Sequence, residues 1–278
     1  MKQKLLFLKE DAKESWNCLR SEKKKFFLAF VLDLLFVISL FFLIAQYTPS
    51  LYENTNNLLS VMEGIGIEEQ ITPEVMNQLF LANQAAQAYY NTILKVFATM
   101  LFFGLIFYII LEGIAWYTMH LAERGCSLNK KSFGKFLARF AIISAVQLIL
   151  FLFFLVLFSQ TKTVTVGNVT LLSKEGSTSF VTTVFILLGL LVDYLCVYSY
   201  SFLVTKNWVR NIFKKPFEHF SYLFLLYLVF AIVAIVFTKI IFMDWNTLIS
   251  LAFALLIVIP TYTYFRILIY KATRRVSE

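Results

Sequence analysis

Four charged side chains lie inside long apolar runs of this sequence. Asp33, Glu112 and Asp193 are acids in three different runs, and Arg266 is a base in a fourth. A charge in hydrocarbon is costly and tends to face the interior of a helix bundle. At about 1.5 Å per residue, each acid falls between the middle of its run and the end that adjoins Lys and Arg: the start of the run for Asp33, and the end of the run for Glu112 and Asp193. The spacing therefore predicts one polar cavity that all four groups share.

Hydroxyl-bearing aromatic residues accompany these charges. Residues 193–202 read DYLCVYSYSF, and residues 260–270 read PTYTYFRILIY. Pro260 lacks a backbone N–H, so we expect it to kink its helix and free a carbonyl group near the charges. The pattern predicts a pathway for a small solute, ion or lipid. Its candidate residues are Asp33, Glu112, Asp193, Arg266, Tyr198 and Tyr262.

Two other interpretations use the same residues. In the first, an acid–arginine pair with hydroxyl partners only holds helices in register, and Arg266 extends toward the headgroups. In the second, Asp33 and Asp193 form a catalytic acid dyad. The sequence has no HExxH, GxSxG or GxxxxGK[ST] motif, and its three cysteines have no CxxC spacing. We therefore predict a non-enzymatic protein with no metal site and no cofactor, and leave open whether the acids are functional or structural.

The runs that carry these charges have the length of membrane-spanning helices. Of 278 residues, 59% are hydrophobic and 15% are charged, whereas a soluble domain has about 25% charged residues. A spanning helix needs about 20 mostly apolar residues and satisfies its own backbone in lipid. The sequence predicts an all-α integral membrane protein with a transmembrane domain over 26–270. Its six transmembrane helices are expected at 26–47, 94–118, 140–159, 180–204, 221–238 and 247–265.

The basic residues indicate the orientation of the chain. Twenty-one of the 25 Lys and Arg residues lie in segments 1–25, 118–139, 205–221 and 266–278, which hold eight, five, four and four of them. Such residues stay on the cytosolic side of a membrane. We expect both termini in the cytosol and the protein in a plasma or cytoplasmic membrane. The net charge of +8 then reflects topology and attraction to anionic inner-leaflet lipids, not binding of nucleic acid.

A short motif recurs where the chain enters the membrane from the predicted cytosolic side. It reads KKFFLAF at 24–30, KKSFGKF at 130–136 and KKPFEHF at 214–220. We expect its lysines to contact headgroups and its two Phe residues, three apart, to begin a buried stripe. The motif favours three antiparallel hairpins of one plan, arisen by internal repetition or by convergence. The predicted headgroup contacts are Lys24, Lys25, Lys130, Lys131, Lys214 and Lys215.

Segments outside the spans also carry structural signals. Residues 1–25 form a cytosolic lead-in whose apolar residues share one helical face, and the segment from Trp208 to Phe213 has the same pattern. Such amphipathic helices lie in the membrane interface. Residues 271–278 form a basic cytosolic tail.

The two longer extracytosolic loops have their own patterns. The loop 48–92 predicts a small helical insert in which a helix begins at Pro73, after the cap Thr72, and runs into the second span. Within the loop 160–179, residues 161–172 alternate apolar and polar around Gly167 and Asn168 and predict a small β-hairpin.

These observations favour a non-enzymatic polytopic membrane protein that binds or moves a small solute, ion or lipid through an inward-facing polar cavity. The alternative is a membrane scaffold or assembly factor. It would use the basic, aromatic cytosolic face to bind anionic lipids, partner subunits or further copies of the chain.

Overall fold

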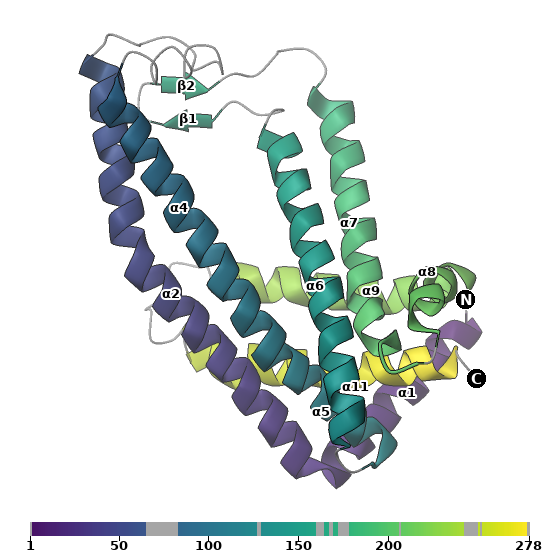
Figure 1. The fold of residues 1–278 in the computed structure, drawn as a ribbon. Helices are drawn as coiled ribbons and strands as arrows, with labels where there is room; N and C mark the ends of the chain where they lie inside the picture. Colours follow the sequence, from purple (N-terminus) through teal and green to yellow (C-terminus); the bar gives the residue numbers. More distant parts are fainter. Residues whose placement is uncertain are drawn as a thin grey trace. The chain divides into compact units, whose positions relative to one another are not determined.

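The computed structural model of the chain describes residues 2–64, 83–126, 129–159, 164–166, 169–171, 178–205, 207–241, 250 and 252–276. Side chains are described for residues 6–64, 83–126, 129–153, 188–205, 207–240, 250 and 252–276. The described segments are helical apart from one short pair of strands (Figure 1). Their bounds are α1 Lys2–Ser21, α2 Lys23–Gly64, α4 Gln84–Phe107, the π-turn η1 Tyr108–Glu112, α5 Gly113–Arg124, α6 Lys130–Ser159, β1 Val164–Val166, β2 Val169–Leu171, α7 Thr178–Phe202, α8 Trp208–Glu218, α9 Phe220–Ile241, the π-turn η2 Ala254–Val258 and α11 Ile259–Arg275.

Five helices within the described residues are long and apolar enough to cross a membrane. They are Lys23–Gly64, Gln84–Arg124, Lys130–Phe153, Phe220–Ile240 and Ala254–Arg275, and Leu188–Phe202 is a shorter apolar helix. These lengths fit an all-α, polytopic integral membrane protein. The sixth span and the arrangement of all the spans as three hairpins stay predictions.

The first long helix and the start of α4 differ from the sequence-based expectation. Helix α2 passes residue 47, the predicted end of the first span, and continues to Gly64. An apolar run marks the part of a helix that suits lipid, not the end of the helix. Helix α4 begins at Gln84, where Oδ1 of Asn83 accepts the N–H groups of Ala85 and Ala86 at 3.0 and 3.2 Å. The cap at Asn83 marks the beginning of α4, and the helix predicted from residue 73 falls outside the described residues.

The predicted β-hairpin is confirmed. Strand β1 pairs antiparallel with β2, and Val164 lies opposite Leu171 while Val166 lies opposite Val169. The alternation of apolar and polar residues, which has the period of a strand, was a sufficient signal.

The chain divides into two compact units. The first comprises Met1–Ile38, Phe107–Ala145 and Leu191–Glu278, and the second comprises Ser39–Ile106 and Val146–Leu190.

Helix α11 is central to the first unit, where it contacts α1, α5 and α9. Ile267 and Ala272 of this helix are fully buried. Its Tyr264 packs edge-on against Trp16 of α1 and donates to the carbonyl oxygen of Ala12 at 2.9 Å. The aromatic-rich end of the last helix therefore forms the core of this unit.

The second unit has a smaller described core. Leu58 and Met62 of α2 pack with Ala86 of α4. Large apolar side chains such as Phe41 and Phe102 are exposed. Surface of this kind is unfavourable in water but not in lipid, where tails are as apolar as the side chains.

The lysine motifs have a structural use that the sequence reading did not include. Lys25 donates from Nζ to two carbonyls at the end of α5, both at 3.2 Å. Arg139, which follows the second motif, donates to two carbonyls at the end of α7. Lys215 donates to the carbonyl of Val276 at the end of α11, at 3.2 Å. The last carbonyls of a helix lack intrahelical donors and attract cations. Each cation therefore binds carbonyl groups at the end of a helix later in the chain: α5 for Lys25, α7 for Arg139 and α11 for Lys215.

The Phe pairs of the motifs follow the expectation only in part. Phe136 of the second motif is buried, whereas Phe27, Phe217 and Phe220 are exposed. The expected buried stripe is therefore wrong for the first and third motifs. The physical reason is that an apolar ring at a membrane border gains as much from lipid as from the protein core.

Candidate functional site

Arg266 of α11 is fully buried and binds two acids. Its Nη1 donates to Oδ1 of Asp33 at 2.6 Å, and its Nη2 donates to Oε2 of Glu112. Asp33 lies on α2, Glu112 lies in η1, and both side chains are also buried. The fold thus brings together three of the charged residues that the sequence singled out.

Two π-helical turns accompany these residues. Glu112 is the last residue of η1, between α4 and α5. The turn η2 ends just before α11, and Pro260 lies in the first turn of that helix. A π-turn widens the helix and changes the direction of the side chains around it. It also adjusts the backbone next to a proline, whose missing N–H leaves one carbonyl group without its usual donor. The expected disturbance at Pro260 therefore takes the form of a widened turn that precedes Arg266.

Aromatic rings cover the guanidinium of Arg266. Its Cζ lies 4.5 Å from the ring centroid of Tyr262 and 5.5 Å from that of Trp116. Cation–π contacts of this kind partly replace the water that a cation loses on burial. The hydroxyl of Thr263 donates to Oδ2 of Asp33 at 2.6 Å. The Arg266 cluster, as we call it below, consists of Asp33, Glu112, Trp116, Tyr262, Thr263 and Arg266.

The Arg266 cluster has more acids than bases. It contains two carboxylates and one guanidinium. The phenols of Tyr108, Tyr262 and Tyr270 also interact with these charged groups, and a phenol carries no charge at physiological pH. With both acids ionised, the cluster would hold an unneutralised negative charge in a buried place, which is strongly unfavourable. The arrangement therefore fits one additional positive charge, supplied by a proton or a small cation.

Two N–H groups of the cluster have no acceptor among the described residues. They are Nε of Arg266 and Nε1 of Trp116, and both are buried. A buried donor without an acceptor costs about 1–3 kcal/mol. A water molecule or a small oxygen-bearing ligand would satisfy such donors. The cluster can therefore hold more than its own side chains.

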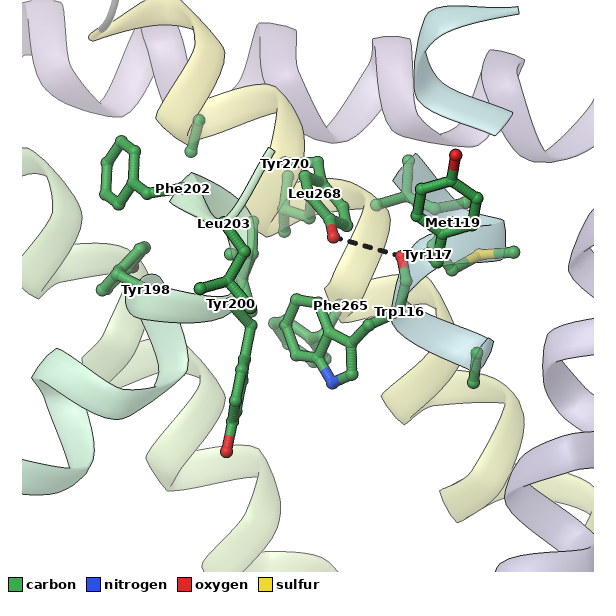
Figure 2. Close-up of a cluster of buried hydrophobic side chains, with 14 of the residues drawn as sticks. Trp116, Tyr117, Met119, Tyr198, Tyr200, Phe202, Leu203, Phe265, Leu268 and Tyr270 are labelled. Atoms are coloured by element: carbon green, nitrogen blue, oxygen red, sulfur yellow. Dashed lines mark hydrogen bonds between the residues drawn. The ribbon is translucent and has the colours of Figure 1, made fainter. Parts of the chain in front are cut away.

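An aromatic layer adjoins the Arg266 cluster. Figure 2 shows Trp116 beside Tyr270, whose hydroxyl donates to the carbonyl oxygen of Trp116 at 3.1 Å. The ring of Trp116 also packs against Tyr200, with centroids 5.3 Å apart. Tyr270 in turn contacts His120, with centroids 5.3 Å apart. Polar atoms therefore continue from the cluster toward the C-terminal end of α5.

Asp193 and Tyr198 lie elsewhere, between α7 and α9. Asp193 is an exposed residue whose carboxylate accepts the hydroxyl of Tyr227 at 2.9 Å. Tyr198 is fully buried and donates to the carbonyl of Leu223 at 2.7 Å. Within the described residues, Asp193 is bound by Tyr227 and by none of the other three charged groups, so a cavity shared by all four stays a prediction. Its depth along the helix followed from the sequence, but α7 turns this residue toward an exposed side, where one hydroxyl serves it.

The six lysines predicted to contact headgroups fall into two groups. Lys24, Lys130 and Lys131 are exposed. Lys214 and Lys215 pair with Glu218 at 3.2 and 3.8 Å, and Lys25 pairs with Glu22 at 3.2 Å. Since Lys25 and Lys215 also cap helices, they serve the fold whether or not they reach a headgroup.

Sequence reasoning did not single out Thr263 or Trp116. Thr263 precedes Arg266 by three residues and Trp116 follows Glu112 by four, so each shares a helical face with a charge that was recognised. That spacing was the available signal. Nothing in the sequence marks His120, although it is only 5% exposed.

The described side chains contain no group of three or more His, Cys, Asp or Glu that could hold a metal ion. Asp33 and Glu112 are two carboxylates that share a guanidinium, so what they offer is a place for a proton or a weakly held cation. No protein-family model, curated protein or solved structure matches this chain.

Proposed function

We propose that this polytopic membrane protein binds a proton or a small cation at the Arg266 cluster and moves it along an inward-facing polar route. The excess of one buried carboxylate over the buried guanidinium carries the proposal. A buried negative charge that no side chain of the protein neutralises is unfavourable. The site is therefore expected to bind a positive charge from the surroundings.

Glu112 is the better of the two proton acceptors. Asp33 accepts hydrogen bonds from Arg266 and from the hydroxyl of Thr263, and both bonds favour its ionised form. Glu112 accepts from Arg266 and also has a side-chain hydrogen-bond interaction with Asp33, which favours a shared proton. It also interacts electrostatically with Asp33, so a proton on either acid neutralises the repulsion between them. In this proposal Glu112 alternates between the two states while Asp33 and Arg266 stay paired.

The polar route toward the basic end of the first unit consists of Trp116, Tyr270 and His120. The hydroxyl of Tyr270 contacts the backbone of Trp116, and its ring contacts His120. Hydroxyl and imidazole groups relay protons or coordinate water, which apolar side chains do not. If the basic end faces the cytosol, as the positive-inside rule predicts, the route opens inward.

Proton flux into proteoliposomes tests the proposal. A potassium diffusion potential would drive protons inward, and a pH-sensitive dye inside the vesicles would report them. We expect wild-type protein to acidify the vesicles and Glu112→Gln to reduce the rate at least tenfold, to about the level of empty vesicles, since the amide binds no proton in this range.

Asp193→Asn is the matched control, because it also neutralises an acid in an apolar helix but lies outside the cluster. We expect it to keep the wild-type rate. Circular dichroism and size-exclusion profiles would establish that both variants are folded. Equal flux in folded Glu112→Gln and in wild type would contradict the proposal and leave the cluster as a structural ion-pair network.

A second candidate function is that of a lipid-binding scaffold, and helix α8 favours it. Val209, Phe213 and Phe217 are exposed along one side of this helix at a spacing of four residues. Arg210 and Lys214 are exposed beside them. A helix with exposed apolar and basic stripes suits the interface of a membrane that contains anionic lipids. Partner subunits or further copies of the chain are the other binding partners that such a face would take.

Vesicle binding separates the second candidate from the first. The variants Lys130→Glu, Lys131→Glu and Lys214→Glu, combined in one chain, reverse charges that cap no helix. We expect this chain to lose preference for anionic over zwitterionic lipid in nanodisc reconstitution and to keep its proton flux. An unchanged lipid preference would refute the scaffold reading, and the lysines would then be markers of topology.

A further inference from the structure

A second polar site lies outside the Arg266 cluster, at the ends of α5, α7 and α11. It is a pocket of about 380 Å³, within the first unit. Small-molecule sites have volumes of about 300–1,000 Å³, so the pocket has room for a small ligand. Its lining includes His120, Arg124, Ser201, Tyr270, Thr273 and Arg274.

The walls of this pocket hold polar groups that are themselves buried. His120, Ser201 and Thr273 are 5%, 7% and 3% exposed. Ser201 donates to the carbonyl of Tyr198 at 2.7 Å, and Thr273 donates to that of Ile269 at 2.9 Å. Both hydroxyl protons are thus used within their own helices, which fixes the two side chains in place.

The imidazole of His120 has no such partner. Its ring packs against Tyr117 and Tyr270, yet its nitrogens form no hydrogen bond with any described residue. The ring nitrogens of His120 are not among the fully buried atoms that lack a partner, so a molecule in the pocket can reach them. Because His120 lines the pocket, a ligand or water in the pocket is what can satisfy its N–H group.

Cations outnumber acids around the pocket. Glu123 is shared by Nη1 of Arg274 at 2.9 Å and Nζ of Lys271 at 3.7 Å. Arg124, the last residue of α5, is exposed, and its guanidinium forms no ion pair within the described part of the chain. Among the residues that line the pocket, one acid, Glu123, faces two cations, Arg124 and Arg274, and the guanidinium of Arg124 is available to a ligand.

We propose that this pocket binds a phosphate group, either of a small phosphorylated solute or of a lipid headgroup at the membrane border. A phosphate has several acceptor oxygens, and guanidinium groups bind them through paired, charge-assisted hydrogen bonds. Arg124 and the N–H of His120 supply donors from α5, and Arg274 supplies donors from α11. The pocket shares His120 and Tyr270 with the polar route proposed above, but phosphate binding is measured without proton flux, so the two proposals can fail separately.

The test uses the full chain in detergent or nanodiscs and two probes. Inorganic phosphate represents the soluble source, and short-chain phosphatidic acid represents the lipid source. Binding would be followed by isothermal titration for phosphate and by native mass spectrometry for the lipid. We expect Arg124→Gln to weaken binding of the recognised probe by about 10- to 100-fold, the effect of losing a charge-assisted hydrogen bond.

Lys135→Gln is the matched control, because Lys135 is an exposed cation of the same unit that does not line the pocket. We expect it to bind within about twofold of wild type. His120→Phe keeps the aromatic packing but removes the ring nitrogens, and we expect it to weaken binding as well. Binding of phosphatidic acid without binding of inorganic phosphate would support the site with lipid as its source. Failure of wild type to bind either probe, or equal binding by Arg124→Gln and Lys135→Gln, would overturn the proposal.

Discussion

Asp33 and Asp193 present the same signal in the sequence and have different surroundings in the fold. Each is an aspartate in a long apolar run. Asp33 is 3% exposed and accepts from Arg266 and Thr263, whereas Asp193 is exposed and accepts from Tyr227 alone. The difference shows that an apolar helix tolerates an acid in two ways. One way is a buried ion pair that makes the acid part of the core, and the other is an exposed position with a single hydroxyl partner.

This difference matters for function. Asp33 belongs to a buried site with one more acid than bases, and Asp193 does not. Removing a partner from the buried site exposes the full cost of a charge in a low-dielectric place. Removing a partner from the exposed site costs about one hydrogen bond. The following variants measure this contrast.

The largest effect is expected for Arg266→Met. The substitution leaves Asp33 and Glu112 buried without a base, and the loss of one partner of a buried ion pair costs about 3–5 kcal/mol. Denaturant unfolding in micelles would measure it. Tyr227→Phe, which removes the partner of Asp193, should cost about 0.5–1.5 kcal/mol. Equal losses in the two variants would erase the contrast between the two aspartates.

A triple variant identifies the cause of the Arg266→Met effect. Adding Asp33→Asn and Glu112→Gln removes both buried charges, so we expect more than half of the lost stability to return. No recovery would mean that Arg266 matters for its packing against Tyr262 and Trp116, not for its charge.

A smaller effect is expected at the glycines beside the two acids. A Cβ at Gly113, next to Glu112, would lie 2.7 Å from Cδ1 of Leu137 and 3.2 Å from Cδ1 of the buried Phe140. Gly113→Ala should therefore cost about 1–3 kcal/mol by overpacking. Gly189→Ala, one turn before Asp193, meets no atom within 4 Å and should be neutral or slightly stabilising. Thermal unfolding of the two alanine variants in one detergent provides the comparison, and a neutral Gly113→Ala would show that α5 and α6 are not tightly packed beside Glu112.

The smallest effect is expected for Asp193→Asn. Asparagine keeps an oxygen that accepts the hydroxyl of Tyr227, so the free energy of unfolding should change by no more than about 0.5 kcal/mol. A loss above about 2 kcal/mol would show that the ionised carboxylate at this position is structural.

Much of this contrast was beyond the sequence, and for identifiable reasons. Apolar runs located the charges along their helices, so the approach of Asp33, Glu112 and Arg266 could be expected. The face on which Asp193 emerges depends on helix rotation, which a run without apolar periodicity does not define. The π-turn that ends at Glu112 shifts the register of the following helix. The residue types in that turn do not predict a π-turn.

The lysine motifs illustrate the same limit in another form. Their position at the membrane border followed from charge and hydropathy. Lys25 contacts Leu121, which lies 96 positions later in the chain, and Lys215 contacts Val276, which lies 61 positions later. The sequence contains no signal for these tertiary contacts. Phe136 is buried and Phe27 is exposed, although both belong to the same sequence motif. The motif does not determine burial where lipid, and not water, surrounds the helices.

The most direct test of the Arg266 cluster as a proton site is infrared difference spectroscopy of the purified protein between acidic and alkaline pH. A protonated carboxylic acid has its own carbonyl band, which an ionised carboxylate lacks. At neutral pH we predict a band that persists in Asp193→Asn and disappears in Glu112→Gln. Absence of any protonated carboxylic acid at neutral pH, or a band that Glu112→Gln leaves unchanged and Asp193→Asn removes, would contradict the assignment of the proton to the cluster.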